Sequence, residues 1–119
     1  ATGRLNTLPH FEHTMQRANL VSVVKAVVGD SPVIAGSWNE PIGMLFIDGG
    51  HGREVARNDY VSWTPHVAVG GTLAIHDVFS DPALGGQAPY EEIYLAAINS
   101  EMFVETSCTG SLRILNRVK

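Results

Sequence analysis

Two short stretches of the chain carry the residue types of a chemical site. One is "DGGH", which contains Asp48, Gly49 and His51, and the other is the adjacent pair His76 and Asp77. Each follows directly on an apolar run. An imidazole can act as a general base near neutral pH, and imidazoles and carboxylates both bind metal ions. These residues therefore predict proton-transfer chemistry, a metal site, or both.

A third acid, Asp30, ends another apolar run and lies between Gly29 and Ser31. In open α/β sheets, ligands bind outside the carboxyl ends of the strands. If each apolar run is a strand, Asp30, Asp48 and Asp77 gather along one sheet edge. Any one of these acids could instead cap the next helix, and that alternative stays open for each alone. Three acids, two of them with a histidine nearby, favour a site.

The metal hypothesis rests on ligand chemistry more than on spacing. Carboxylate oxygens suit a hard divalent cation, and Asp48 and Asp77 would supply two of them. Mg²⁺ has little affinity for imidazole, so His76 as a direct ligand would favour Mn²⁺, Fe²⁺ or Zn²⁺. His51 has a plainer alternative role, as a residue at a helix start that is hydrogen-bonded to the backbone.

The candidate site residues meet at one sheet edge only if the chain alternates between strands and helices. The apolar run at 42–48 does not alternate, which is typical of a strand covered on both faces. Two runs flanking Thr109 and Gly110 predict an antiparallel hairpin at the end of the chain. We expect one α/β domain over residues 1–119, with a mostly parallel sheet. The expected strands are 20–30, 42–48 and 70–78, and the expected helices are 7–18, 31–38 with Ser31 as its cap, 52–67 and 90–98.

The composition excludes several classes of protein. The chain has 119 residues, 45% of them apolar and 17% charged, with no apolar run of membrane-span length. Its net charge of -4 and the absence of a Lys/Arg cluster argue against a nucleic-acid partner, because such binding rests mainly on phosphate neutralisation. The lone Cys108 cannot form an internal disulfide and is expected to be buried. We expect a cytoplasmic protein that binds no membrane.

Residues 42–78 resemble the C-terminal half of a class I S-adenosylmethionine-dependent methyltransferase of the small-molecule O-methyltransferase-like group. "VVGDS" at 27–31 is similar to the third-strand motif of that family. The resemblance implies a Rossmann-like three-layer sandwich with an antiparallel C-terminal hairpin. The motif positions in register are Asp48, Gly49, His51, Asp59, Trp63, Pro65, Gly70, Gly71, His76 and Asp77.

The resemblance also implies a cofactor and the residues around it. S-adenosylmethionine would be held by Gly29, Asp30 and Ser31 around its adenine and by Asp48 and Gly49 beside its methyl group. The acceptor would be a small molecule, covered by the Gly- and Pro-containing loop at 79–89 as a mobile lid.

Catalytic roles follow from the same resemblance. His51 would take the proton from an acceptor hydroxyl, with Asp48 as the second catalytic residue. Asp59 would either orient His51 or lie in solvent. In metal-dependent relatives the positions of Asp48, His76 and Asp77 hold a divalent ion such as Mg²⁺ or Mn²⁺. His76 departs from the acid found there, which puts Mg²⁺ in question.

The glycine-rich loop that opens complete enzymes of this fold has no counterpart in the sequence, which contains no GxGxG. We therefore expect the C-terminal portion of a longer protein, lacking the first two strands and part of the cofactor site. Activity of this portion alone is then in question. Free strand edges invite pairing, so a homodimer or strand exchange is a further hypothesis.

Two other function classes stay open. A metal-dependent hydrolase could use Asp48, His51, His76 and Asp77 to activate water, and tight metal binding without S-adenosylmethionine binding would favour it. A non-catalytic interaction module could retain the second half of the fold, and loss of Asp48 and His51 without functional effect would favour that.

Overall fold

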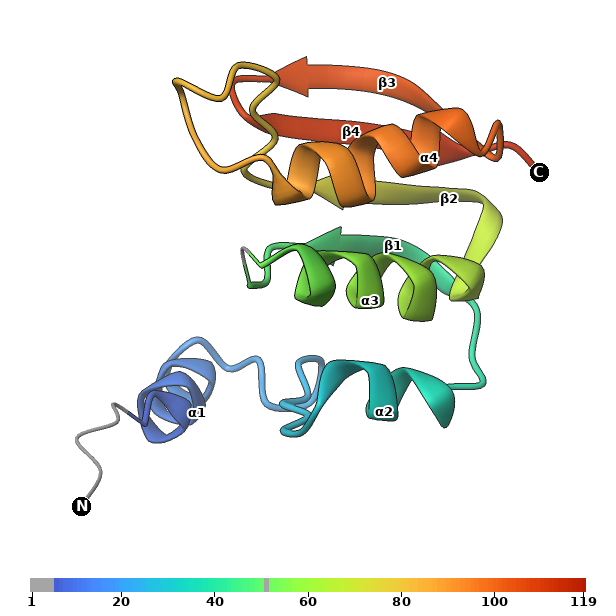
Figure 1. Ribbon diagram of the computed structural model, residues 1–119. Helices are drawn as coiled ribbons and strands as arrows, with labels where there is room; N and C mark the ends of the chain where they lie inside the picture. Colours follow the sequence, from blue (N-terminus) through green and yellow to red (C-terminus); the bar gives the residue numbers. More distant parts are fainter. Residues whose placement is uncertain (1–5, 51) are drawn as a thin grey trace.

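The computed structural model describes residues 6–50 and 52–119. From α2 to β3 helices and strands alternate along the chain, as the sequence predicts, whereas α1 is followed directly by α2 (Figure 1). The elements are α1 Leu8–Arg17, α2 Ser31–Gly36, β1 Ile42–Ile47, α3 Arg53–Trp63, the 3-10 turn η1 Thr64–His66, β2 Val67–Ile75, the π-helical segment η2 Pro89–Tyr94, α4 Leu95–Asn99, β3 Phe103–Thr109 and β4 Leu112–Arg117.

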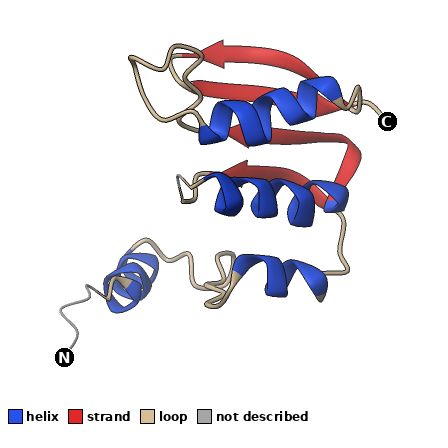
Figure 2. Cartoon of the chain, in the orientation of Figure 1, coloured by secondary structure: helices blue, strands red, loops and turns tan. Residues whose placement is uncertain are grey.

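Within the described residues the strands form one mixed sheet in the order β1-β2-β4-β3. β1 and β2 run parallel, with Ile47 opposite Ile75, and β4 is antiparallel to both of its neighbours. The turn of the β3–β4 hairpin contains Gly110 at a φ of 58°, a left-handed conformation that glycine adopts without a steric penalty. The predicted α/β class and the C-terminal hairpin are confirmed (Figure 2).

The core lies between the sheet and the helices α3, η2 and α4, which cover the same face (Figure 1). Leu73, Ile75 and Leu115 are fully buried on the sheet side, and Ile93 and Ala97 meet them from η2 and α4. Full burial of one such aliphatic side chain contributes about 1.5–3 kcal/mol. This packing fixes β1 and β2 relative to each other, and with them the residues at their carboxyl ends.

The predicted strand at 20–30 is wrong. The segment makes a turn, in which the amides of Val23 and Val24 donate to the carbonyl of Leu20, and then continues without regular structure. A strand needs a neighbour to satisfy its backbone groups, and no strand among the described residues lies beside this segment. Its β-branched side chains are largely exposed as a result, including Val23 and Val28.

The prediction that β1 is covered on both faces is also wrong. Leu45 and Ile47 point toward the helices, whereas Met44 and Phe46 on the other face are 63% and 52% exposed. Alternate side chains of a strand point to opposite faces, and the helices that contact the core lie on one of them. Cys108 is likewise exposed rather than buried, because β3 is an edge strand with a single buried residue.

The start of α2 differs in detail from the prediction. Asp30, not Ser31, occupies the N-cap position of α2, and its side chain makes no capping hydrogen bond. Thr7 occupies the N-cap position of α1, while the Asn6 side chain accepts a hydrogen bond from the amide of Leu8. None of the helices in the described part of the chain is long and apolar enough to cross a membrane.

Candidate functional site

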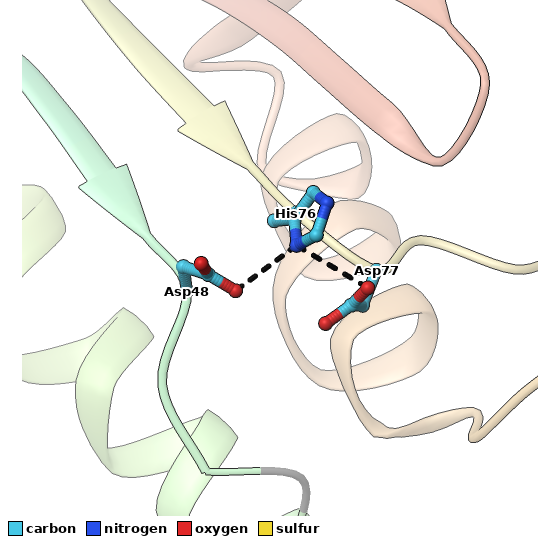
Figure 3. A group of neighbouring side chains, drawn as sticks. All are labelled: Asp48, His76 and Asp77. Carbon is cyan, nitrogen blue, oxygen red and sulfur yellow. Dashed lines mark hydrogen bonds and ion pairs between the residues drawn. The ribbon is translucent and has the colours of Figure 1, made fainter.

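The carboxyl ends of β1 and β2 bring three predicted site residues together. Asp48 follows β1, and His76 and Asp77 follow β2. His76 Nδ1 lies 3.0 Å from Asp48 Oδ1 and 3.2 Å from Asp77 Oδ1 (Figure 3). The backbone amide of His76 also donates to the carbonyl of Ile47, so the ladder holds this junction in place. We call these three residues the Asp-His-Asp cluster.

The backbone around the cluster is locally unusual. Asp77 adopts a φ of 60°, a left-handed conformation that costs a non-glycine residue about 1–2 kcal/mol. This conformation lets the chain turn directly after the strand, so both His76 and Asp77 reach the same edge of the sheet. The side chains remain accessible, with Asp48 47% and His76 42% exposed. One atom from each of the three side chains lies within 4.8 Å of the others, close enough to ligate one metal ion.

A cleft of about 560 Å³ opens beside the cluster. The predicted cofactor-binding residues Gly29, Ser31, Asp48 and Gly49 all line it. Its volume lies within the ~300–1,000 Å³ range of small-molecule sites. Asp30 does not line the cleft, although its chain neighbours Gly29 and Ser31 do, and it does not end a strand of the sheet. The expected gathering of three aspartates is therefore wrong for Asp30 and confirmed for Asp48 and Asp77.

The cleft has an apolar part and a polar end. Apolar side chains from the chain before β1 and from the open face of β1 line most of it, including Val27, Trp38, Met44 and Phe46. The polar groups are Ser31, at the start of α2, Asp48, directly after β1, and Asp59, within α3. This division suits a ligand with an apolar body and a polar head.

Two tryptophans hold α2 against α3 and so position Ser31. Trp63 Nε1 donates to Ser31 Oγ at 2.7 Å, and the Trp63 ring meets Trp38 edge-on with centroids 5.6 Å apart. His66 Nε2 lies 3.0 Å from the carbonyl oxygen of Ala35, which adds a second link to α2. The predicted motif residue Trp63 thus lies at the packing contact that shapes one wall of the cleft.

Asp59 lies close to the site, and not in open solvent as one of the two alternatives for it predicted. A Cβ placed on Gly49 would lie 3.0 Å from Asp59 Oδ2, so the carboxylate approaches the loop through the space left by this glycine. Asp59 lines the large cleft and also a small adjoining pocket that contains the Asp-His-Asp cluster. His51, the predicted base, lies outside the described residues, so its relation to Asp59 stays a prediction.

An ion-pair network next to the site was not predicted from the sequence. Arg53 on α3 pairs with Glu91 and Glu92 on η2, and Arg57 bonds Glu92 through two nitrogens, each at 3.0 Å. The hydrogen bonds from Arg57 hold the pKa of Glu92 below its ordinary value. These partners lie 35 or more positions apart along the chain, and no local pattern predicts such pairs.

The loop predicted as a lid is held together by contacts between its own residues. Gln87 Nε2 donates to the carbonyl of Phe79 at 2.6 Å, and the Phe79 ring packs on Gly85. Asp81 accepts a hydrogen bond from the amide of Ala83. The loop leaves the sheet next to Asp77, which puts it beside the site, but its motion stays a prediction.

A family model described as a methyltransferase domain matches residues 3–78 of the chain. The chain belongs to this methyltransferase family. The matched segment contains β1 and β2 with the cluster residues that follow them, so the site lies inside the part that defines membership.

Solved structures of methyltransferases share the fold. MycE methyltransferase from the mycinamycin biosynthetic pathway, in complex with Mg, SAH and mycinamycin VI, aligns with a TM-score of 0.55 at 21% identity. A protein from Clostridium thermocellum, assigned as an rRNA methylase without experimental demonstration, aligns with a TM-score of 0.67 at 12% identity. An rRNA methylase from Streptococcus thermophilus aligns with a TM-score of 0.59 at 16% identity.

The alignments differ in how much of each protein they cover. They include 78% of this chain but 31% of the MycE chain. For the Clostridium and Streptococcus proteins they include 93% and 94% of this chain, and 66% and 69% of the matched chains. The chain therefore spans about a third of MycE, and at these identities the likeness shows the common Rossmann-like fold.

Proposed function

We propose that this domain belongs to an S-adenosylmethionine-dependent enzyme that transfers a methyl group to an oxygen of a small molecule. The observation that carries the proposal is the position of Asp48 in a chain of this family. Its carboxylate lies at the carboxyl end of a parallel strand and is shared by the cleft and the Asp-His-Asp cluster. Ligands of open α/β sheets bind at such strand ends.

The polar end of the cleft is the proposed donor site. Gly29 and Ser31, which line the cleft, would border the adenine. Asp30 lies between them in the chain but does not line the cleft, so its own contact with the adenine stays a prediction. Asp48 and Gly49 would lie beside the sulfonium, where a carboxylate offers a favourable electrostatic partner to a positive charge. Gly29 and Gly49 both line the cleft, and because glycine has no side chain the cleft is lined by backbone at these two positions.

The chemistry required of the domain is modest. The sulfonium is already an activated donor, so the protein must align the acceptor oxygen with the methyl group and accept its proton. An O–CH₃ bond forms as the S–CH₃ bond breaks, and the hydroxyl proton passes to a base. We propose His51 as that base, with Asp48 as the second catalytic residue.

A divalent metal fits the donor set at the cluster. Asp48 and Asp77 offer carboxylate oxygens and His76 offers an imidazole nitrogen, within reach of one ion. A bound cation would favour the deprotonated form of an acceptor hydroxyl. The proposed metal-binding residues are these three.

An RNA acceptor is the second candidate, because two of the similar folds belong to rRNA methylases by name. Affinity for RNA rests largely on neutralising phosphates, and this chain has a net charge of -4. The charge favours the small-molecule acceptor. Transfer of a radiolabelled methyl group to total RNA, but not to small-molecule extracts, would reverse that preference.

Calorimetric titration tests the donor site. S-adenosylmethionine is titrated into this chain and into the longest natural form of the protein, each with and without Mg²⁺. We expect binding by the long form, lost on Asp48→Asn and kept in the control Glu12→Gln, an exposed acid on α1. Absence of binding by both forms would contradict the proposal and favour the hydrolase or interaction-module alternatives.

A further inference from the structure

We infer that the Asp-His-Asp cluster binds a divalent transition-metal ion such as Mn²⁺ or Zn²⁺ in preference to Mg²⁺. The inference deepens the proposed function, since it rests on the same site and names the ion that the site accepts. It concerns the difference between this chain and the Mg-containing MycE structure, not the presence of a metal in the fold.

The separations in the cluster suit one shared ion. Two ligands held about 2.1 Å from one metal at about a right angle are themselves about 3 Å apart. His76 Nδ1 lies 3.0 Å from Asp48 Oδ1 and 3.2 Å from Asp77 Oδ1. An ion bound by these atoms would therefore need little rearrangement of the side chains.

The identity of the central ligand decides the choice of ion. Mg²⁺ prefers oxygen ligands in near-ideal octahedral geometry, whereas imidazole suits zinc and the first-row transition ions. His76 is the member that contacts both carboxylates, so an ion at the centre of the cluster would lie within reach of its imidazole. A nitrogen at this position disfavours Mg²⁺.

The backbone fixes His76 at the centre. Its amide donates to the carbonyl of Ile47 at 3.1 Å, which ties it to β1. The next residue, Asp77, takes the left-handed conformation that turns its carboxylate toward the imidazole. The ligands are thus held by the β1–β2 ladder, while their exposed faces leave a path for an ion and for water.

The same separations also suit a cluster without metal, in which the imidazole donates a hydrogen bond to a carboxylate. Titration of the metal alone separates the two states. The protein is treated with chelator, exchanged into clean buffer and titrated calorimetrically with MnCl₂, ZnCl₂ and MgCl₂. We expect Mn²⁺ and Zn²⁺ each to bind at least tenfold more tightly than Mg²⁺, and bound Mn²⁺ to give an electron paramagnetic resonance spectrum distinct from that of the free ion.

Substitution of the central ligand gives the sharper test. His76→Asp replaces the nitrogen by an oxygen and should narrow the preference for Mn²⁺ over Mg²⁺, whereas His13→Asp, on exposed α1, should leave it unchanged. Circular dichroism of each variant verifies that it is folded. Equal or tighter binding of Mg²⁺ by the unaltered protein, no binding of any of the ions, or an unchanged preference in folded His76→Asp would overturn the inference.

A parallel titration of the longest natural form with S-adenosylmethionine, in chelator, keeps the two proposals apart. Donor binding without the metal preference contradicts this inference alone. A metal preference without donor binding contradicts the proposed function instead.

Discussion

His76 Nδ1 lies 3.0 Å from Asp48 Oδ1, although 28 positions separate the two residues in the chain. The contact exists because β1 and β2 are parallel neighbours that end at the same level, with Ile47 opposite Ile75. Each strand then delivers its next polar side chain to one edge of the sheet. The site is therefore a property of two adjacent strand ends, and the predictions below test its parts and their support.

Asp48 is expected to matter for both proposed ligands. Asp48→Asn keeps the size of the side chain and removes its charge, so it should weaken both S-adenosylmethionine binding in the longest natural form and Mn²⁺ binding at least tenfold. Calorimetry measures both affinities. The Glu12→Gln control removes the same charge from exposed α1 and should change neither. Unchanged affinities in Asp48→Asn would remove Asp48 from the site.

The strand that carries His76 and Asp77 depends on the core behind it. Leu73 is fully buried on β2, and Leu73→Ala should lower the free energy of unfolding by about 2–5 kcal/mol. Val69 lies on the same strand but is 67% exposed, so Val69→Ala should change it by less than about 0.5 kcal/mol. Urea denaturation followed by circular dichroism compares the two. Similar effects of both substitutions would show that β2 is not packed as described.

The predicted lid loop, at 79–89, contains two glycines that serve as a matched pair. A Cβ on Gly85 would clash with the Phe79 ring, so Gly85→Ala must displace that ring and loosen the loop. Gly86 has open space at the same position, and Gly86→Ala should leave the loop as it is. Limited proteolysis followed by mass spectrometry should find faster cleavage within the loop in Gly85→Ala alone. Equal cleavage rates would refute the ring contact.

The Arg57–Glu92 pair predicts a pH-dependent contribution to stability. The hydrogen bonds from Arg57 lower the pKa of Glu92 from its ordinary 4.5, so the pair stabilises the folded state above that pH. The contribution is lost as the pH falls through the lowered pKa of the folded state. Melting temperatures of the unaltered chain and Glu92→Gln should therefore differ at pH 7 and converge in acid. A difference that grows in acid would contradict the sign.

The sequence predicts much of the site because strand ends are easy to recognise. Asp48, His76 and Asp77 each follow an apolar run, and parallel pairing alone suffices to bring them together. The C-terminal hairpin was predictable for a similar reason, since Gly110 marks its turn between two β-rich runs. In both cases a local signal determines the structure.

The predictions are wrong where the structure of a segment depends on residues far away in the sequence. Residues 20–30 have strand composition, but no described strand pairs with them, and Asp30 is not part of the cluster. Met44 and Phe46 look like core residues, yet their face of the sheet is open. The pairs from Arg53 and Arg57 to Glu91 and Glu92 depend on how α3 packs on η2, which no periodicity in the sequence encodes.

The hydrogen bond from the His76 amide to the Ile47 carbonyl has a consequence for how the chain acquires its shape. Since the ligand atoms converge only after β1 and β2 have docked, an ion at the cluster would report on that docking step. Bound Mn²⁺ followed by rapid-freeze spectroscopy could then time the pairing of these two strands during refolding, separately from consolidation of the β3–β4 hairpin. Metal binding by these three side chains would thus give the time at which β1 and β2 pair during assembly of the sheet.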